Sequence, residues 1–87
     1  MTEQQWTELL KQEGFSNVYI WEDGPNFEYP DHTHEKKTAH VVLRGEMTLT
    51  DHGKIKTLSE GERFDIQSGT THSAKMGPEG CRYLAAE

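Results

Sequence analysis

The chain has 87 residues, of which only 32% are hydrophobic, and its mean hydropathy is -0.88. This length, without a Pro-, Ser- or Gly-rich linker, predicts a single domain over residues 1–87 with a thin core. The net charge of -6 repels a phosphate backbone and therefore excludes nucleic acid as an expected partner.

Cysteine content and the N-terminal sequence indicate the cellular setting. Cys81 is the only cysteine, so no disulfide can form within the chain and a small disulfide-held scaffold is excluded. The segment from Met1 to Trp6 lacks the basic start and apolar stretch of a signal peptide, and no apolar run reaches membrane-spanning length. We therefore expect a cytoplasmic protein that does not enter a membrane.

The first predicted element is a short helix. Thr2 and Gln5 have the spacing of a capping box, which begins many helices. Trp6 and Leu10 follow at helical spacing, and Gly14 is suited to ending the helix.

After Asn17 the chain consists of short runs of β-forming residues separated by Gly, Pro, Asp and Ser. One strand is expected around Phe27 and Tyr29, with a break after it at Pro30 and Asp31. The others are expected at 18–21, 38–43, 46–50, 54–58, 63–66, 72–76 and 82–85. About eight short strands are typical of a sandwich, a jelly roll or a small barrel. In the strand 38–43, alternation places Thr38, His40 and Val42 on one face.

Three histidines are candidate metal ligands. His32 and His34 lie on the same side of an extended chain, with Cα atoms about 6.6 Å apart. This pair alone is weak evidence, because a stable site needs at least a third ligand from a distant segment. His72 is the candidate, since it follows the turn-forming residues around Gly69 and begins a strand.

The spacing of these residues resembles the two motifs of the cupin family, G(X)5HXH(X)3,4E(X)6G and G(X)5PXG(X)2H(X)3N. The histidines and glycines in register are His32, His34, Gly45, Gly61, Gly69 and His72. The resemblance implies an all-β fold: a cupin-type jelly-roll β-barrel, here with a short N-terminal α-helix. It also implies one divalent metal ion held by the three histidines.

Four positions depart from the family pattern. Asn26 stands at the first glycine, where it can adopt left-handed backbone, while Gln67 and Met76 replace a proline and an asparagine. Thr38 occupies the position of the metal-binding glutamate. Without that carboxylate the ligands are neutral imidazoles, which favour Zn, Fe or Ni over Mg or Ca.

His40 shares the inward strand face with Thr38 and is a fourth candidate ligand. Two other roles stay open for it: a group that orients substrate, and a buried, hydrogen-bonded ring without metal. His52 is expected at an exposed hairpin tip beside Gly53, with no part in the site.

Apolar residues and Cys81 complete the prediction for the barrel interior. Cys81 is expected to be a buried thiol without a catalytic role. Tyr29 and Met76 are the favoured cavity residues among five candidates, the others being Phe27, Phe64 and Ile66. Strand alternation forces no Asp or Glu into the cavity, so an obvious general base is missing.

Two functions follow from these expectations. The first is a metal-dependent enzyme of the dioxygenase or isomerase type, acting on a small organic molecule. The alternative is a non-catalytic module that senses a metal or metabolite. The expected partners are a small-molecule ligand and a second copy of the chain in a homodimer, because the core is thin and a jelly roll exposes edge strands.

Overall fold

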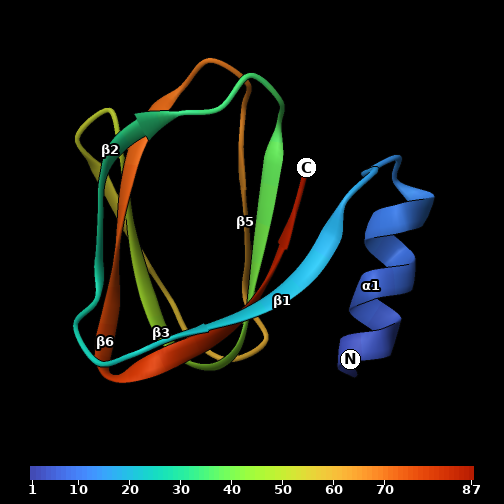
Figure 1. Ribbon diagram of the computed structural model, residues 1–87, viewed down its shortest axis with the longest axis horizontal. Coiled ribbons are helices and arrows are strands. Elements are labelled where there is room, and N and C mark those ends of the chain that lie inside the picture. The colour runs from blue at the N-terminus through green and yellow to red at the C-terminus, as the bar shows by residue number, and fades with distance from the viewer.

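The computed structural model describes residues 1–87 and contains one helix followed by antiparallel strands (Figure 1). The elements are α1 (Glu3–Gln12), β1 (Val18–Asp23), β2 (Glu28–Thr33), β3 (Thr38–Asp51), β4 (Lys54–Leu58), β5 (Arg63–Ile66) and β6 (Thr71–Ala86). The predicted all-β fold with a short N-terminal helix is confirmed. The helix does not reach the length or apolar character that crossing a membrane requires.

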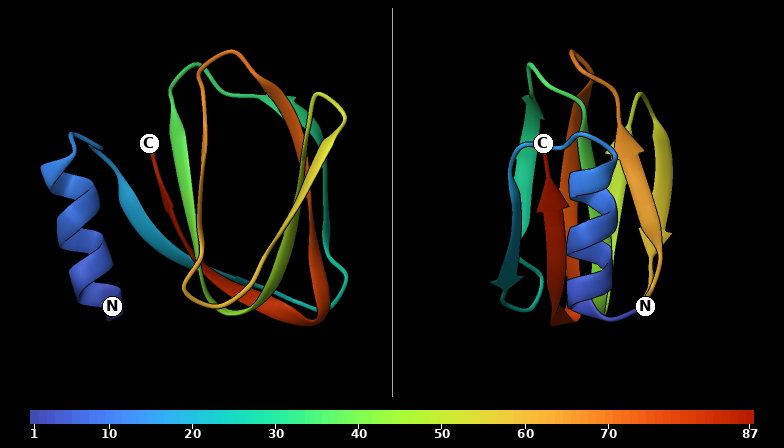
Figure 2. Two further views of the ribbon diagram at one scale, coloured as in Figure 1. Left: turned by 180° about the vertical axis from the view of Figure 1, so that it is seen from behind. Right: turned by 90° about the vertical axis from the view of Figure 1, so that its right-hand side faces the viewer.

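Two long strands, β3 and β6, organise the barrel. The first half of β6 pairs with β2 and the second half with β1, while β3 pairs with β6, β4 and β5 along its length. Both strands curve around the interior, which gives the jelly-roll shape (Figure 2). As a result, β1 and β2 each pair on one side only, with different halves of β6.

The prediction of separate strands on either side of Gly45, and between Met76 and Arg82, is wrong. Glycines mark both places, but the chain bends there without leaving the sheet. The pairing of β3 with β6 shifts register between Val42 and Arg44, and again between Gly45 and Met47. Such bulges let a strand turn sharply and continue, so turn-forming residues mark a bend instead of an end.

The helix covers the outer face of the sheet (Figure 2). The predicted capping box is confirmed, because the Gln5 amide donates to Thr2 Oγ1 and the Thr2 amide donates to Gln5 Oε1. Leu10 is fully buried against sheet residues that include Val41 and Leu84. Arg63 also binds Glu13 at the helix end, with an N–O distance of 2.7 Å.

The core therefore consists of two apolar clusters, one under the helix and one inside the barrel, where a single thin core was expected. The barrel cluster consists of Val42, Met47, Leu49, Leu58, Ile66, Met76, Cys81, Tyr83 and Ala85. The sheet between the clusters is buried on both faces, so even a small chain can fix β3 and β6 firmly. These two strands provide much of the wall of the cavity described next.

Candidate metal centre

Three histidines from two segments of the chain converge beside the barrel interior. His32 lies in β2, and His34 is the first residue after the end of that strand. The pairing of β2 with β6 places His32 opposite His72. The ring centroid of His32 is 4.2 Å from that of His72 and 4.8 Å from that of His34. One ligand nitrogen from each ring lies within 4.8 Å of the other two. The predicted convergence is present, whereas metal ligation by these rings stays a prediction.

A bulge in β2 helps to position the pair. The sequence predicted a break at Pro30 and Asp31, but β2 continues through both residues, and its register shifts between Tyr29 and His32. Proline is tolerated because β2 is an edge strand, where a missing amide donor need not cost a ladder hydrogen bond.

Backbone carbonyls orient two of the three rings. His32 Nδ1 lies 2.7 Å from the Pro30 oxygen, and His72 Nδ1 lies 3.3 Å from the Thr70 oxygen. A carbonyl only accepts, so each Nδ1 carries the proton and each Nε2 presents a lone pair. Histidines that bind metals are commonly oriented in this way.

Burial also favours the neutral form of His72. Only 2% of this residue is exposed, and burial lowers its pKa, an effect that the bond to Thr70 offsets only in part. A neutral imidazole is the form that binds a metal ion. With two rings oriented by backbone carbonyls, one of them buried, and a third ring beside them, the residues present fit a divalent transition-metal ion.

His40 lies farther along the cavity wall than the three converging rings. Its ring centroid is 6.5 Å from that of His72, and the group of three close nitrogens does not include it. Its Nδ1 is buried without a hydrogen-bond partner, so the expected alternative of a hydrogen-bonded ring does not hold for this atom. Burial, with a smaller contribution from the neighbouring His72, lowers the pKa of His40 to about 4.

The buried His40 predicts a pH-dependent stability of the metal-free protein. The native pKa is about 4 and the ordinary value is 6.5. Below about pH 6.5 the unfolded chain therefore binds a proton at His40 that the native state does not bind, and stability falls until about pH 4. The shift corresponds to about 3 kcal/mol in total.

Urea unfolding of the metal-free protein and of His40→Gln at about pH 7.5 and about pH 4.5 measures this effect. Acid should cost the wild type about 2–3 kcal/mol more than the variant, since all other groups titrate in both proteins. Parallel losses of stability would show that His40 titrates normally.

Thr38 replaces the family's carboxylate with a small buried side chain. The residue is 5% exposed, and its Oγ1 has no hydrogen-bond partner. Its neighbours Ala39 and Val41 pack under the helix, so alternation along β3 turns Thr38 and His40 to the inner face, as predicted. No carboxylate therefore accompanies the three histidines at this position.

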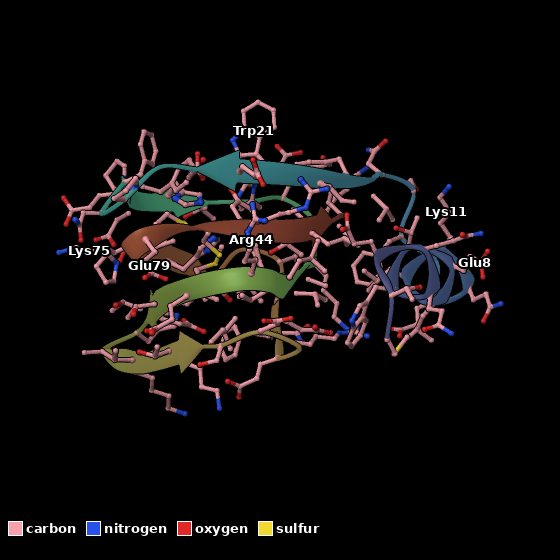
Figure 3. The ribbon with its side chains drawn as sticks, turned by 90° about the horizontal axis from the view of Figure 1, so that it is seen from below. Glu8, Lys11, Trp21, Arg44, Lys75 and Glu79 are labelled. Atoms are coloured by element: carbon pink, nitrogen blue, oxygen red, sulfur yellow. The ribbon has the colours of Figure 1, made fainter.

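A mainly apolar cavity of about 560 Å³ extends from the histidines. Its lining residues are Tyr19, Trp21, Tyr29, Pro30, His32, His34, His40, Met47, Leu49, His72, Ala74, Met76, Tyr83 and Ala85. Tyr19 and Trp21 are about half exposed and lie on the edge strand β1, so they are at the cavity opening. Figure 3 shows the side chain of Trp21 standing out from its strand. The volume is within the range of pockets for small organic molecules.

The predictions for individual cavity residues are partly right. Tyr29 and Met76 line the cavity, as predicted. Phe27 is about half exposed and lies outside it, while Phe64 and Ile66 pack in the barrel core. Strand alternation predicts which side chains face the barrel interior. It does not distinguish those that pack in the core from those that line the cavity.

Two other side chains lie where they were expected, away from the site. His52 is exposed at the hairpin tip. Cys81 is a buried free thiol whose pKa is raised to about 11 by burial, so it is not a nucleophile at neutral pH.

A carboxylate that the sequence did not predict lies behind the cavity wall. Asp23 Oδ2 accepts hydrogen bonds from the hydroxyls of Tyr29 at 2.7 Å and Tyr83 at 2.9 Å. Both tyrosines line the cavity, although Asp23 itself does not. Alternation with Cys81 and Ala85 in the sequence could have indicated that Tyr83 faces the barrel interior. The hydrogen bond from Tyr83 to Asp23, however, depends on the pairing of Asp23 with Cys81, which follows from the fold and not from local sequence.

The family model of the Cupin domain matches residues 19–87, which is most of the chain. The chain belongs to the cupin family. The resemblance of the two histidine motifs is thereby confirmed over both halves of the barrel.

Solved structures share the fold of this cupin. A cupin-2 domain containing protein from Shewanella frigidimarina has a TM-score of 0.71 at 22% identity, over 80% of this chain and 67% of its own. A protein of unknown function from Rhizobium leguminosarum has a TM-score of 0.74 at 19% identity, and the match covers 79% of this chain and 65% of the other. KdgF from Halomonas sp. has a TM-score of 0.68 at 21% identity, and the match covers 79% of this chain and 66% of the other.

These similarities show the fold alone, because the identities are low. This cupin spans about two thirds of the length of each of these three neighbours. Among curated proteins, none matches the chain. The function must therefore be argued from the histidines and the cavity.

Proposed function

We propose that this cupin binds one divalent transition-metal ion through His32, His34 and His72 and acts on a small organic molecule in the adjoining cavity. The reaction would be of the dioxygenase or isomerase type. The observation that carries the proposal is the convergence of three imidazole nitrogens within 4.8 Å at the wall of an apolar cavity of about 560 Å³. Such a site leaves coordination positions for an oxygen-bearing ligand.

The donor set favours Zn, Fe or Ni. All three donors are neutral, and Thr38 contributes no carboxylate, so the full positive charge of the ion would remain at the site. When bound, such an ion supplies Lewis acidity toward an oxygen ligand or water. The apolar walls exclude water from the ligand, and His40 serves either as a fourth metal ligand or as a group that holds the substrate.

Metal analysis and turnover together test the proposal. Protein purified without an affinity tag is expected to contain about one equivalent of Zn, Fe or Ni, removable by a chelator. Iron-loaded protein is then assayed for oxygen consumption, and the other metal forms for isomer exchange, with small carboxylic acids and phenols. Absence of metal, together with no uptake of Zn, Fe or Ni by the metal-free protein, contradicts the proposal.

One observation favours the alternative of a non-catalytic sensor. No Asp or Glu is among the cavity-lining residues, and His40, with a pKa of about 4, is a weak base. Tight ligand binding by the metal-loaded protein without turnover would support a sensor that acts through a partner.

We also propose that the protein is a cytoplasmic homodimer. Support comes from the unpaired edge of β1 and from exposed aromatic residues near it, Tyr19, Trp21 and Phe27. Sedimentation should show a species of about twice 10.0 kDa at micromolar concentration. Only a monomer under those conditions argues against the dimer, and cell fractionation tests the compartment.

A further inference from the structure

Tyr29 and Tyr83 line the cavity and form a polar cluster with Asp23, which lies behind the cavity wall. The two phenolic oxygens are 3.3 Å apart, and both lie within 2.9 Å of the same carboxylate oxygen, Oδ2 of Asp23. The other oxygen, Oδ1, accepts a hydrogen bond from Trp21 Nε1 at 3.1 Å. Side chains from β1, β2 and β6 thus meet at one point.

The cluster has a fixed hydrogen-bonding polarity. An ionised carboxylate only accepts, so both tyrosines donate their single proton to Asp23. Burial, followed by the contacts within the cluster, raises the pKa of Tyr83, and burial raises that of Tyr29, so both phenols stay protonated. Each phenolic oxygen then has only lone pairs left to offer a ligand.

The cluster shares one cavity with the histidines. The ring centroid of Tyr29 is 6.5 Å from that of His32, and that of Tyr83 is 6.3 Å from that of His40. Around them the wall is apolar and includes Met47, Leu49 and Met76. A ligand in this cavity therefore meets a positively charged centre, if the metal is bound as proposed above, together with apolar walls and a pair of hydrogen-bond acceptors.

We propose that the Tyr29 and Tyr83 hydroxyls form a second recognition point, and that the ligand is a small hydroxylated organic acid with an apolar, aromatic-sized body. This inference rests on the proposed function, because the acid group is assigned to the metal. Its hydroxyl donates to the tyrosine oxygens. An ammonium group fits less well, because the lone metal ion would repel it and Asp23 already accepts three hydrogen bonds.

Pairs of acids that differ by one hydroxyl test the inference. Cobalt-loaded protein is titrated with benzoate, 3-hydroxybenzoate and 4-hydroxybenzoate, and with phenylacetate and its 4-hydroxy and 4-aminomethyl derivatives, following the visible spectrum of cobalt. At least one hydroxylated acid should bind about three- to tenfold more tightly than its parent, the value of one net hydrogen bond. No gain from any hydroxyl, or a larger gain from the amine, overturns the proposal.

Tyrosine variants assign the gain to this cluster. In Tyr29→Phe/Tyr83→Phe, and in each single variant should the double one fold poorly, the hydroxyl gain should disappear while the parent acids bind within about twofold of wild type. Tyr19→Phe is the matched control, because Tyr19 lines the opening of the same cavity and makes no hydrogen bond to Asp23. A hydroxyl gain that survives in all the Tyr29 and Tyr83 variants overturns the assignment.

Calorimetry on metal-free protein separates this inference from the metal proposal. The hydroxyl preference should persist there, although every acid binds more weakly. If cobalt does not bind the histidines, the metal proposal fails, yet the same pairs still measure the tyrosine acceptors. If cobalt binds and no hydroxyl preference appears in either form, only the second recognition point is wrong.

Discussion

Replacing His72 by alanine should reduce metal affinity by more than about a hundredfold. His72 is the buried member of the three histidines and the only one from β6, so its loss leaves two donors from one segment at the edge of the sheet. Even residues that merely support ligands are worth about 10- to 100-fold in affinity. Competition with a chromophoric chelator, using Zn or Co, measures the change.

His52→Ala is the matched control for this experiment. His52 is exposed beside the turn glycine Gly53, outside the cavity, and its removal should leave affinity within about twofold. Circular dichroism of both variants checks that the barrel is intact. One full equivalent of metal bound to His72→Ala at wild-type affinity would falsify the proposed centre.

Replacing Gly45 by alanine should destabilise the protein by about 3–5 kcal/mol. Gly45 has a φ of 82° at the bend of β3, and a Cβ there would meet the backbone oxygen of Gly80 in β6. Backbone cannot move aside as a side-chain end can, so β3 and β6 would have to separate. Urea unfolding of the metal-free protein at neutral pH measures the loss.

Gly53→Ala separates the clash from the backbone strain. Gly53 has a similar φ of 80°, but a Cβ there would meet nothing within 4 Å. It should cost only about 1–2 kcal/mol, the strain of a left-handed alanine. Equal losses at the two positions would mean that the approach of β3 to β6 is not close enough to require glycine.

Local signals in the sequence predicted local structure well. The capping box at Thr2 and Gln5 formed as expected, because its partners are three residues apart. Asn26 has a φ of 59°, in agreement with its place at a family glycine. The two histidine motifs also fixed which rings converge, since their spacing reflects the barrel's pairing.

Features that depend on tertiary packing were missed. Bulges near Gly45 and Pro30 let strands continue where turn residues predicted their ends. Asp23 reaches the tyrosines only because β1 pairs with the second half of β6. No spacing of residues in the sequence indicates this pairing. Strand alternation therefore could not predict the carboxylate behind the cavity wall.

The one-sided pairing of β2 has a consequence for the stability of the barrel. Two of the converging imidazoles belong to or follow this peripheral strand, and the third belongs to β6, which is paired on both sides. An ion held by all three would join this edge strand to β6 at a point other than their backbone hydrogen bonds. Metal binding would then act as a cross-link within the chain, and the free energy of unfolding should rise as the free metal concentration exceeds the dissociation constant.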